Sequence, residues 1–270
     1  MHNNMKETTT ISVILPIHEL DETTKQLFSN AVQSVKDQLV RPNELVIVVP
    51  SNSDVATYVK SFDYGDFKDS VVIAENSGET DFASQVNYGV SQAKSQWVSI
   101  LEFDDEYAKI WFKNVVKYID AHTEVELFLP IIIDVDGSNN FVGFTNEAVW
   151  AHGFSEVLGR LNDDALLSYQ NFNTDGMVIK KSVIESFGGF KPSIKLTFIY
   201  EFLLRMTFKD VKIMVIPRFG YKHMNQRAGS LFMGYKENLD PVEAKWWLAQ
   251  AKKERYFPND RKITYEVQNA

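Results

Sequence analysis

The chain contains no cysteine, and this absence excludes disulfide bonds, thiolate zinc sites and a cysteine nucleophile. It also lacks any apolar run of the roughly 20 residues needed to cross a bilayer, so we expect no transmembrane segment. The polar start of the chain, Met1–Thr10, has no apolar core of the kind found in signal peptides. Together these absences lead us to expect a soluble, cytoplasmic protein.

Positive charge is scarce as well. The 270 residues carry a formal net charge of −8, and basic residues cluster only near the end of the chain, at Lys252–Arg255 and Arg261–Lys262. We therefore expect no stable binding of nucleic acid, because such binding depends on neutralising phosphates. The chain also lacks a phosphate-binding P-loop, a dinucleotide-binding glycine motif after its first apolar run, and an HExxH zinc motif.

What the chain has is the composition of a globular protein, with 44% hydrophobic and 13% aromatic residues. Apolar runs rich in β-branched residues alternate with segments whose apolar residues have helical spacing. This pattern predicts an α/β fold with a doubly wound, mostly parallel sheet and helices on both faces. The expected strands are 11–16, 44–50, 71–74 and 97–101, and the expected helices between them are 22–38, 55–62 and 83–93.

Beyond residue 106 the pattern is less regular. A helix is predicted at 108–121 and a strand at 127–133, whereas 134–173 shows no clear period. Helix and strand patterns return between residues 177 and 216. Asp240 followed by Pro241 is typical of a helix start, which predicts a C-terminal helical extension.

Four carboxylates lie within the five residues Glu102–Glu106, directly after the apolar run 97–101. Ligands of open α/β sheets bind just outside the carboxyl ends of the strands. Carboxylates held close together repel one another and are stable mainly when a cation shares them. Continued strand alternation would send Glu102 and Asp104 to the same side. The pattern suits Mg²⁺ or Mn²⁺ carrying a diphosphate, and the alternative is a solvated acidic loop.

Five segments, in order, resemble the family 2 glycosyltransferases, nucleotide-diphospho-sugar transferases with the GT-A fold. The resemblance spans roughly residues 11 to 232. It is carried by the opening strand with its proline, an Asn-x-Gly turn followed by a small-residue helix, a Gly-Gly-Phe turn, a helix-closing arginine, and a Tyr-x-His tail followed by Gly-Ser. These segments are Val13–Pro16, Asn76–Ala93, Glu185–Phe190, Leu203–Arg205 and Tyr221–Ser230.

The resemblance implies a metal-dependent hexosyltransferase that moves a sugar from a UDP-type donor to a hydroxyl acceptor, a glycan by expectation, with inversion. It implies Mn²⁺ or Mg²⁺ as the cofactor, held by a variant DxD motif with Glu102 and Asp104, and by His223. The donor-binding residues that it implies are Pro16, Ser51, Asn76, Gly78, Asn87, Asp105 and Arg227.

We further expect residues 1–270 to form a single domain. Its parts would be a nucleotide-sugar-binding half at 11–106, an acceptor-side half at 107–235 and the helical extension at 236–270.

The sequence departs from the family pattern at two places. Pro50–Asp54 stands where the family has an Asp-Asp-Gly-Ser run, which leaves the nucleobase open. Phe198 and Ile199 stand where inverting members have a Glu-Asp pair whose Asp is the general base. Asp175 and Glu201 are the remaining candidates for the catalytic base, although Glu201 is better explained as a helical ion-pair partner of Arg205.

Three other functions remain as alternatives. A non-catalytic GT-A-like protein that binds sugar or a partner would explain the missing Glu-Asp pair. A glycosyltransferase acting on nucleic-acid bases is disfavoured by the negative net charge. A nucleotidyltransferase would have a glycine-rich, basic run after the first strand, and this chain has Ile17–Asp21 there.

Overall fold

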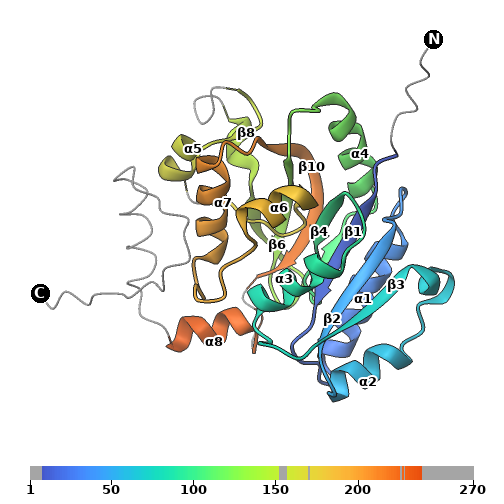
Figure 1. Cartoon of the computed structure of the whole chain (residues 1–270). Coiled ribbons are helices and arrows are strands. Elements are labelled where there is room, and N and C mark those ends of the chain that lie inside the picture. The colour runs from blue at the N-terminus through green and yellow to red at the C-terminus, as the bar shows by residue number, and fades with distance from the viewer. Residues whose placement is uncertain (1–7, 152–156, 170, 226, 228, 239–270) are drawn as a thin grey trace, which may run out of the picture.

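The first half of the chain alternates strands with helices, as the sequence predicts (Figure 1). The computed structural model describes residues 8–151, 157–169, 171–225, 227 and 229–238. β1 lies in the middle of this half and pairs in parallel with β2 and β4, and β2 pairs in parallel with β3. The elements are β1 (Ile11–Pro16), α1 (Thr24–Lys36), β2 (Glu44–Pro50), α2 (Asp54–Ser61), the 3-10 helix η1 (Gly65–Ser70), β3 (Val71–Asn76), α3 (Phe82–Gln92) and β4 (Trp97–Ile100).

The second half extends the same sheet with longer and more irregular strands. Its elements are β5 (Glu106–Tyr107), α4 (Trp111–Ala121), β6 (Leu127–Val135), β7 (Phe141–Thr145), the 3-10 helix η2 (Glu147–Trp150), β8 (Arg160–Leu161), α5 (Asp163–Ser168), β9 (Val178–Lys180), α6 (Lys181–Phe187), α7 (Phe198–Phe208), β10 (Ile213–Met224) and α8 (Leu231–Asn238).

Two features of this half differ from the prediction. The stretch 134–173, which has no clear sequence period, contains β7, β8 and α5, because its strands are too short to leave a periodic signal. β10 continues eight residues past the predicted strand end at Ile216. Its pairing with β6 is irregular between Val215 and Phe219, and Pro217, which cannot donate to a sheet ladder, lies within that interval.

The strand order is β3-β2-β1-β4-β9-β6-β10-β5, with β7 pairing to β6 and β8 to β10. β9 is antiparallel to both β4 and β6, and β10 is parallel to β6, so β4, β6 and β10 run in the same direction as β1. The carboxyl ends of these four strands therefore meet at one edge of a mostly parallel sheet.

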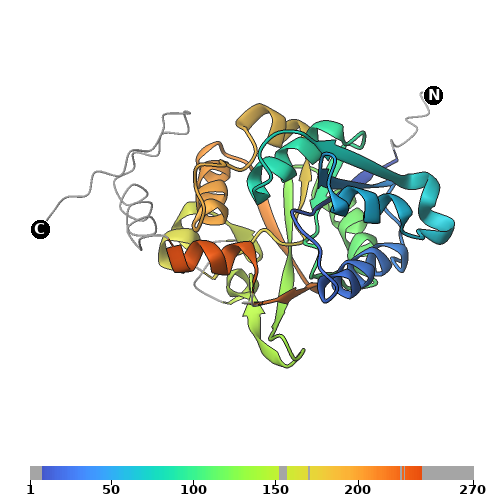
Figure 2. The ribbon, with the colours of Figure 1, turned by 90° about the horizontal axis from the view of Figure 1, so that it is seen from below.

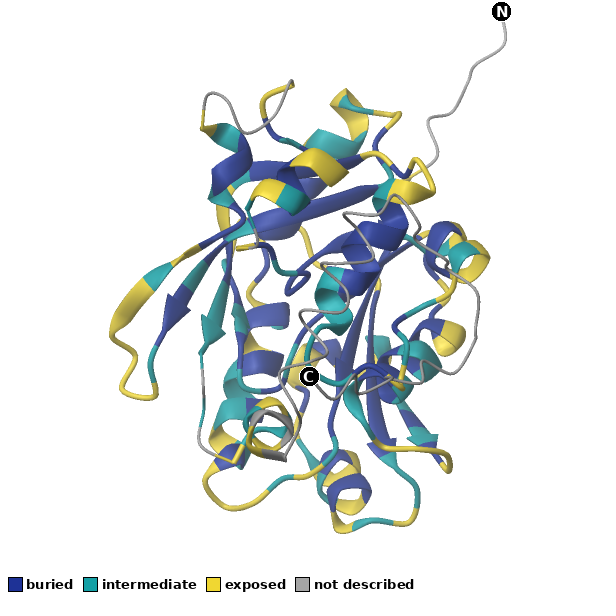
Figure 3. Cartoon of the chain, turned by 90° about the vertical axis from the view of Figure 1, so that its left-hand side faces the viewer, coloured by how far each residue is buried: buried dark blue, intermediate teal, exposed yellow. Residues whose placement is uncertain are grey.

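Two hydrophobic cores lie on the two faces of the sheet. Alternate residues of β1 show the division: Val13 and Leu15 pack with α1, α2 and α4, whereas Ile14 packs with α3, α6 and α7. Figure 3 shows most of the central strands dark blue, and therefore buried, between helices with exposed outer faces, whereas the hairpin strand β7 is largely exposed. This arrangement is the α/β architecture with helices on both faces that the sequence predicts.

None of the helices that the structure describes is both long enough and apolar enough to span a membrane. The helix predicted to begin at Asp240 lies outside the described residues.

Candidate functional site

The acidic segment begins where β4 ends. β4 stops at Ile100, and the backbone N–H of Asp105 donates to the carbonyl oxygen of Glu102 at 3.2 Å, so these residues form a turn rather than a continued strand. The residues of this turn still alternate in burial, as the strand pattern predicts. Phe103 and Asp105 are buried, whereas Glu102 and Asp104 are partly exposed and line the same cavity.

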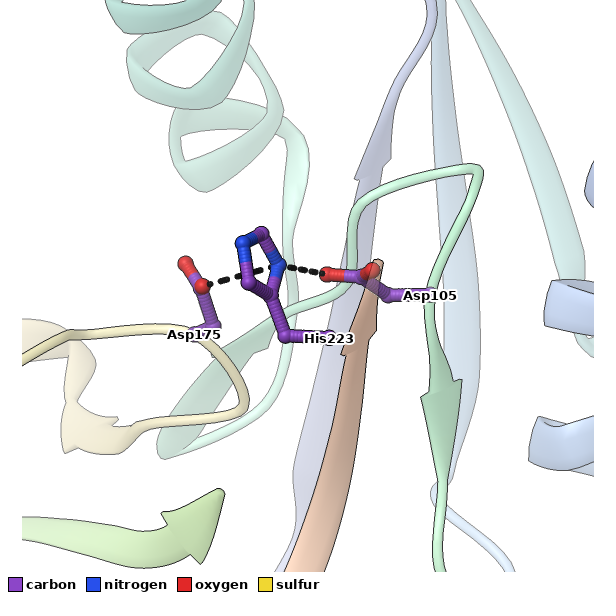
Figure 4. Close-up of side chains that lie close together, drawn as sticks. All are labelled: Asp105, Asp175 and His223. Carbon is purple, nitrogen blue, oxygen red and sulfur yellow. Dashed lines mark hydrogen bonds and ion pairs between the residues drawn. The ribbon is translucent and has the colours of Figure 1, made fainter. Parts of the chain in front are cut away.

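Three loops and strand ends bring two carboxylates and one imidazole together (Figure 4). Asp105 comes from the turn after β4, Asp175 from the loop before β9, and His223 from the end of β10; one ligand atom of each lies within 4.8 Å of the others. His223 Nδ1 lies 3.0 Å from Asp105 Oδ2 and 3.4 Å from Asp175 Oδ2. Neither carboxylate engages Nε2 of the ring.

Asp105 also fixes the backbone of β10. Its Oδ1 accepts a hydrogen bond of 2.7 Å from the backbone N–H of Met224, so both of its carboxylate oxygens are bonded to the end of this strand. Tyr221 adds a second connection, because its hydroxyl oxygen accepts a 3.0 Å hydrogen bond from the backbone N–H of Glu102. The acidic turn and the end of β10 are therefore held as one unit.

A glycine allows the loop that carries Asp175 to approach this unit. Gly176 has a φ of +69°, and a Cβ at this position would lie 2.5 Å from the ring of Tyr221. Its N–H donates to the carbonyl of Ile100 at 3.2 Å, and its carbonyl accepts from Trp111 Nε1 at 3.1 Å. Asn173 Nδ2 then donates to the carboxylate of Asp175 at 2.5 Å, which orients that carboxylate.

The electrostatics of the site are those of crowded, desolvated carboxylates. Burial, followed by the charges of Asp175, Asp105 and Asp104, raises the pKa of Glu102 well above its ordinary value. Burial likewise raises the pKa of Asp175 to about 7. Burial disfavours the charged form of His223, but Asp105 and Asp175 outweigh this effect and raise the pKa of the imidazole well above its ordinary value.

These residues lie at a cavity of about 490 Å³. Its polar lining comes from the ends of β4, β6 and β10 and from the loop before β9. Its apolar lining comes from the segment that begins α7, from Phe82 and from α8. The residues that line the cavity include His18, Phe82, Asp134, Lys195, Leu196, Phe198, Ile199, Tyr200 and Phe232.

The structure brings part of the predicted site to this cavity. The predicted residues that line it are Pro16, Glu102, Asp104, Asp175, His223 and Arg227. Asp105 lies beneath it, bonded to His223. Arg227 Nε donates to Asp104 Oδ2 at 2.6 Å, and its guanidinium lies 5.2 Å from the centre of the Phe103 ring.

The remaining predicted donor residues lie away from the cavity lining. Ser51 and Asn76 are at the carboxyl ends of β2 and β3, and the backbone N–H of Ser51 donates to the carbonyl of Asn76 at 2.9 Å. The Asn76 amide bonds to the backbone of Gly78 and Glu79, which shapes the turn after β3.

Asn87 and Glu201 are engaged within the protein. The amide of Asn87 makes two hydrogen bonds with the backbone of Phe190, at 2.7 and 3.0 Å, which join α3 to the turn after α6. Glu201 is fully buried, and its carboxylate pairs with Arg205 at 2.8 Å and Lys191 at 3.1 Å. The ion-pair explanation of Glu201 therefore accounts for its position.

Sequence reasoning missed several polar residues of the lining, Asp134 and His18 among them. Asp134 lies opposite His223 in the β6–β10 register, and its Oδ2 accepts a 2.8 Å hydrogen bond from the hydroxyl of Thr145. Asp134 ends an apolar strand as the acidic motif does, and this was the signal that could have found it. The partly buried His18, whose ring lies 5.8 Å from that of Phe103, had no such signal.

The sequence model of "Glycosyl transferase family 2" matches residues 12–183. The chain belongs to glycosyl transferase family 2. No curated protein sequence matches it significantly. A structure of TarS 1-349 from S. aureus in complex with UDP-GlcNAc is similar, with a TM-score of 0.63 at 16% sequence identity, covering 92% of this chain and 71% of that chain.

The TarS 1-349 structure in complex with UDP has a TM-score of 0.61 at 14% identity, covering 92% of this chain and 82% of that chain. For a longer TarS chain from S. aureus the TM-score is 0.60 at 16% identity, and the match covers 92% of this chain but only 43% of that one. At these identities the likeness shows the fold, which is GT-A.

Proposed function

We propose that this protein is a metal-dependent, inverting glycosyltransferase that moves a hexose from a UDP-sugar to a hydroxyl acceptor. The observation that carries the proposal is the convergence of Asp105, Asp175 and His223 at the shared carboxyl edge of β4, β6 and β10, beside a cavity. This edge is where parallel α/β sheets bind their ligands. The complexes of TarS with UDP and UDP-GlcNAc support a UDP-type donor.

The donor set fits a divalent cation. Carboxylate oxygens are the ligands that Mg²⁺ and Mn²⁺ prefer, and one imidazole favours Mn²⁺. His223 would offer Nε2, because Nδ1 is the ring nitrogen that faces the nearest oxygens of Asp105 and Asp175, and Glu102 would supply an oxygen. Asp104 would join them once its pair with Arg227 opens. The cation would supply positive charge against a leaving diphosphate.

We assign the role of catalytic base to Asp175. Its carboxylate lines the cavity, and its pKa of about 7 suits a group that must accept a proton near neutral pH. Asn173 holds it by a hydrogen bond of 2.5 Å. Glu201 is a weaker candidate because its buried carboxylate is committed to Arg205 and Lys191.

Arg227 is the proposed partner of the donor diphosphate. In this structure its guanidinium donates to Asp104. A bound diphosphate could replace this carboxylate and accept two hydrogen bonds from the same planar group. Pro16 lines the cavity at the end of β1, near where a nucleotide would enter. Ser51, Asn76 and Gly78, at the ends of β2 and β3, remain proposed contacts of the nucleoside.

A donor-hydrolysis assay tests the proposal without knowledge of the acceptor. UDP-GlcNAc incubated with the protein and Mn²⁺ should release UDP, and a chelator should stop the release. His223→Ala should lower the rate at least about tenfold, because it removes a proposed metal ligand. His122→Ala, a partly exposed histidine at the end of α4, is the matched control and should keep the wild-type rate.

Two results would contradict the proposal. UDP release that is equally fast with chelator would exclude the metal. No release from any UDP-sugar, together with no nucleotide binding, would favour the non-catalytic alternative.

A further inference from the structure

We propose that the acceptor is amphiphilic, with an aliphatic or aromatic body attached to the part that carries its hydroxyl, rather than a glycan without an apolar part. The inference rests on the proposed transferase function and names the substrate class of the same cavity. It comes from one side of that cavity, which we name the apolar wall and define as Phe82, Leu196, Phe198, Ile199, Tyr200 and Phe232.

The apolar wall is built where the start of α7 meets the start of α3. The ring of Phe198 lies 5.4 Å from that of Phe82 and 5.4 Å from that of Phe190, centre to centre. Phe198, Ile199 and Tyr200 pack against the core and remain partly exposed where they line the cavity. α8, which lies beside α7 in Figures 1 and 2, adds Phe232, whose side chain is 46% exposed.

Three polar side chains at or beside this wall are engaged within the protein, and Thr197 also lines the cavity here. The hydroxyl of Tyr200 donates to the carbonyl of Leu166 at 3.2 Å. The ammonium of Lys195 lies 3.7 Å from Asp81 Oδ1. Glu201, the first carboxylate of α7, is turned into the core against Arg205. The wall therefore presents mainly hydrocarbon to anything that lies against it.

This surface discriminates between two kinds of acceptor. A sugar ring pressed against the wall would lose the hydrogen bonds that its hydroxyls make with water and would gain few in return, which is unfavourable. An aliphatic or aromatic body would gain free energy in proportion to the area it removes from water. The polar groups needed at the reacting hydroxyl are gathered elsewhere in the cavity, around Asp175 and His223.

The geometry thus fits an amphiphilic acceptor, with its hydroxyl toward Asp175 and its apolar body along the wall. Such a body also excludes water from the cavity, because it fills the part of the lining that offers water few partners. Phe198 and Ile199 act here as specificity-determining residues.

Two probes with the same sugar head test this inference. Methyl β-D-glucopyranoside and n-octyl β-D-glucopyranoside, kept below its micelle concentration, are titrated against the full chain in the presence of UDP and Mn²⁺, with ligand-observed NMR as the readout. We expect the octyl compound to bind at least about tenfold more tightly than the methyl compound, because only its chain can cover the wall.

Three variants locate the effect. Phe198→Ala and Phe232→Ala should each reduce the octyl-to-methyl preference at least about threefold, and Phe232 is exposed enough that its variant should fold. Phe219→Ala is the matched control, because Phe219 is 50% exposed and does not line the cavity. This control should leave the preference unchanged.

The inference is overturned if UDP binds with Mn²⁺ but the two glucosides bind equally. It is also overturned if the preference survives in both wall variants or is lost in Phe219→Ala. Absence of UDP binding in the same titration overturns the proposed function, and this inference with it.

Discussion

At the scale of single residues, the main feature of the site is that several negatively charged groups lie close together. Glu102, Asp105 and Asp175 are crowded around one imidazole, and Asp105 and Asp175 are buried. Each buried carboxylate is stable only with a proton, a cation or hydrogen bonds to share its charge. Asp105 and Asp175 raise the pKa of His223, which favours its charged form as the partner of these carboxylates, and a divalent cation would share their charge in the proposed enzyme. The same crowding gives Asp175 its raised pKa.

The first prediction concerns Asp175. Asp175→Asn keeps the shape and the hydrogen bond from Asn173 but cannot accept a proton, so transfer should slow by about 10²–10⁴-fold. Binding of UDP with Mn²⁺ should stay within about twofold of wild type, as measured by calorimetry. Asp69→Asn, at an exposed position in η1, is the matched control and should change neither quantity. Lost Mn²⁺ affinity in Asp175→Asn would instead make this residue a metal ligand.

At the scale of the elements, strand ends set the position of every proposed site residue, and helices hold the loops between them. Arg205 of α7 shows how: its guanidinium donates to the carbonyls of Phe187, Gly188 and Gly189 at 2.6–2.7 Å. Glu201, one turn earlier, neutralises that guanidinium. The pair therefore joins α7 to the turn that follows α6.

The second prediction tests this role of Glu201. Glu201→Gln leaves the buried Arg205 and the partly buried Lys191 without their anion, so the free energy of unfolding should fall by about 3–5 kcal/mol. Urea denaturation measures the change. Glu185→Gln removes an exposed i,i+4 partner of Lys181 and should change stability by less than about 1 kcal/mol. Equal stability of the two variants would contradict the structural role.

The elements also show which features a sequence can reveal. The strands β1, β2 and β4 lie within continuous apolar runs rich in β-branched residues, which can be recognised in the sequence, and the acidic motif directly follows the last of these runs. Asp175 was a candidate base from the sequence, and it lines the cavity in the structure. Asp134 was missed because its proximity to His223 depends on the long-range pairing of β6 with β10. Asn87 was assigned to the donor from the family resemblance, and its bonds to Phe190, 103 residues away, leave no local signal in the sequence.

At the scale of the whole molecule, the two core clusters fix the sheet, and the sheet brings chain segments more than 100 residues apart to one edge.

The carboxylates crowded at that edge should make the stability of the protein depend on pH. The folded form of Asp175 holds a proton between the ordinary aspartate pKa and about 7, whereas the unfolded chain releases it. The stabilisation from charged His223 is present below its unfolded pKa and is lost as pH rises through the higher folded pKa.

The third prediction follows from these signs. Without metal, the unfolding temperature should fall as pH rises from about 5 to about 8, since the folded state binds more protons than the unfolded state in this window. Asp175→Asn should show a shallower fall. Mn²⁺ should stabilise the protein most at the upper end, where its ligands are deprotonated. A flat or rising profile in the metal-free protein would contradict the charge assignments.

The most direct test of the central claim is calorimetry of the full chain with UDP, with and without Mn²⁺. A metal held at the edge of β4 and β10 and carrying the diphosphate requires UDP to bind at least about tenfold more tightly with Mn²⁺ than with chelator. ADP, GDP and CDP, titrated in the same way, report whether uridine is preferred. UDP affinity that is unchanged by Mn²⁺, or no binding of any of the four nucleotides, would contradict the account.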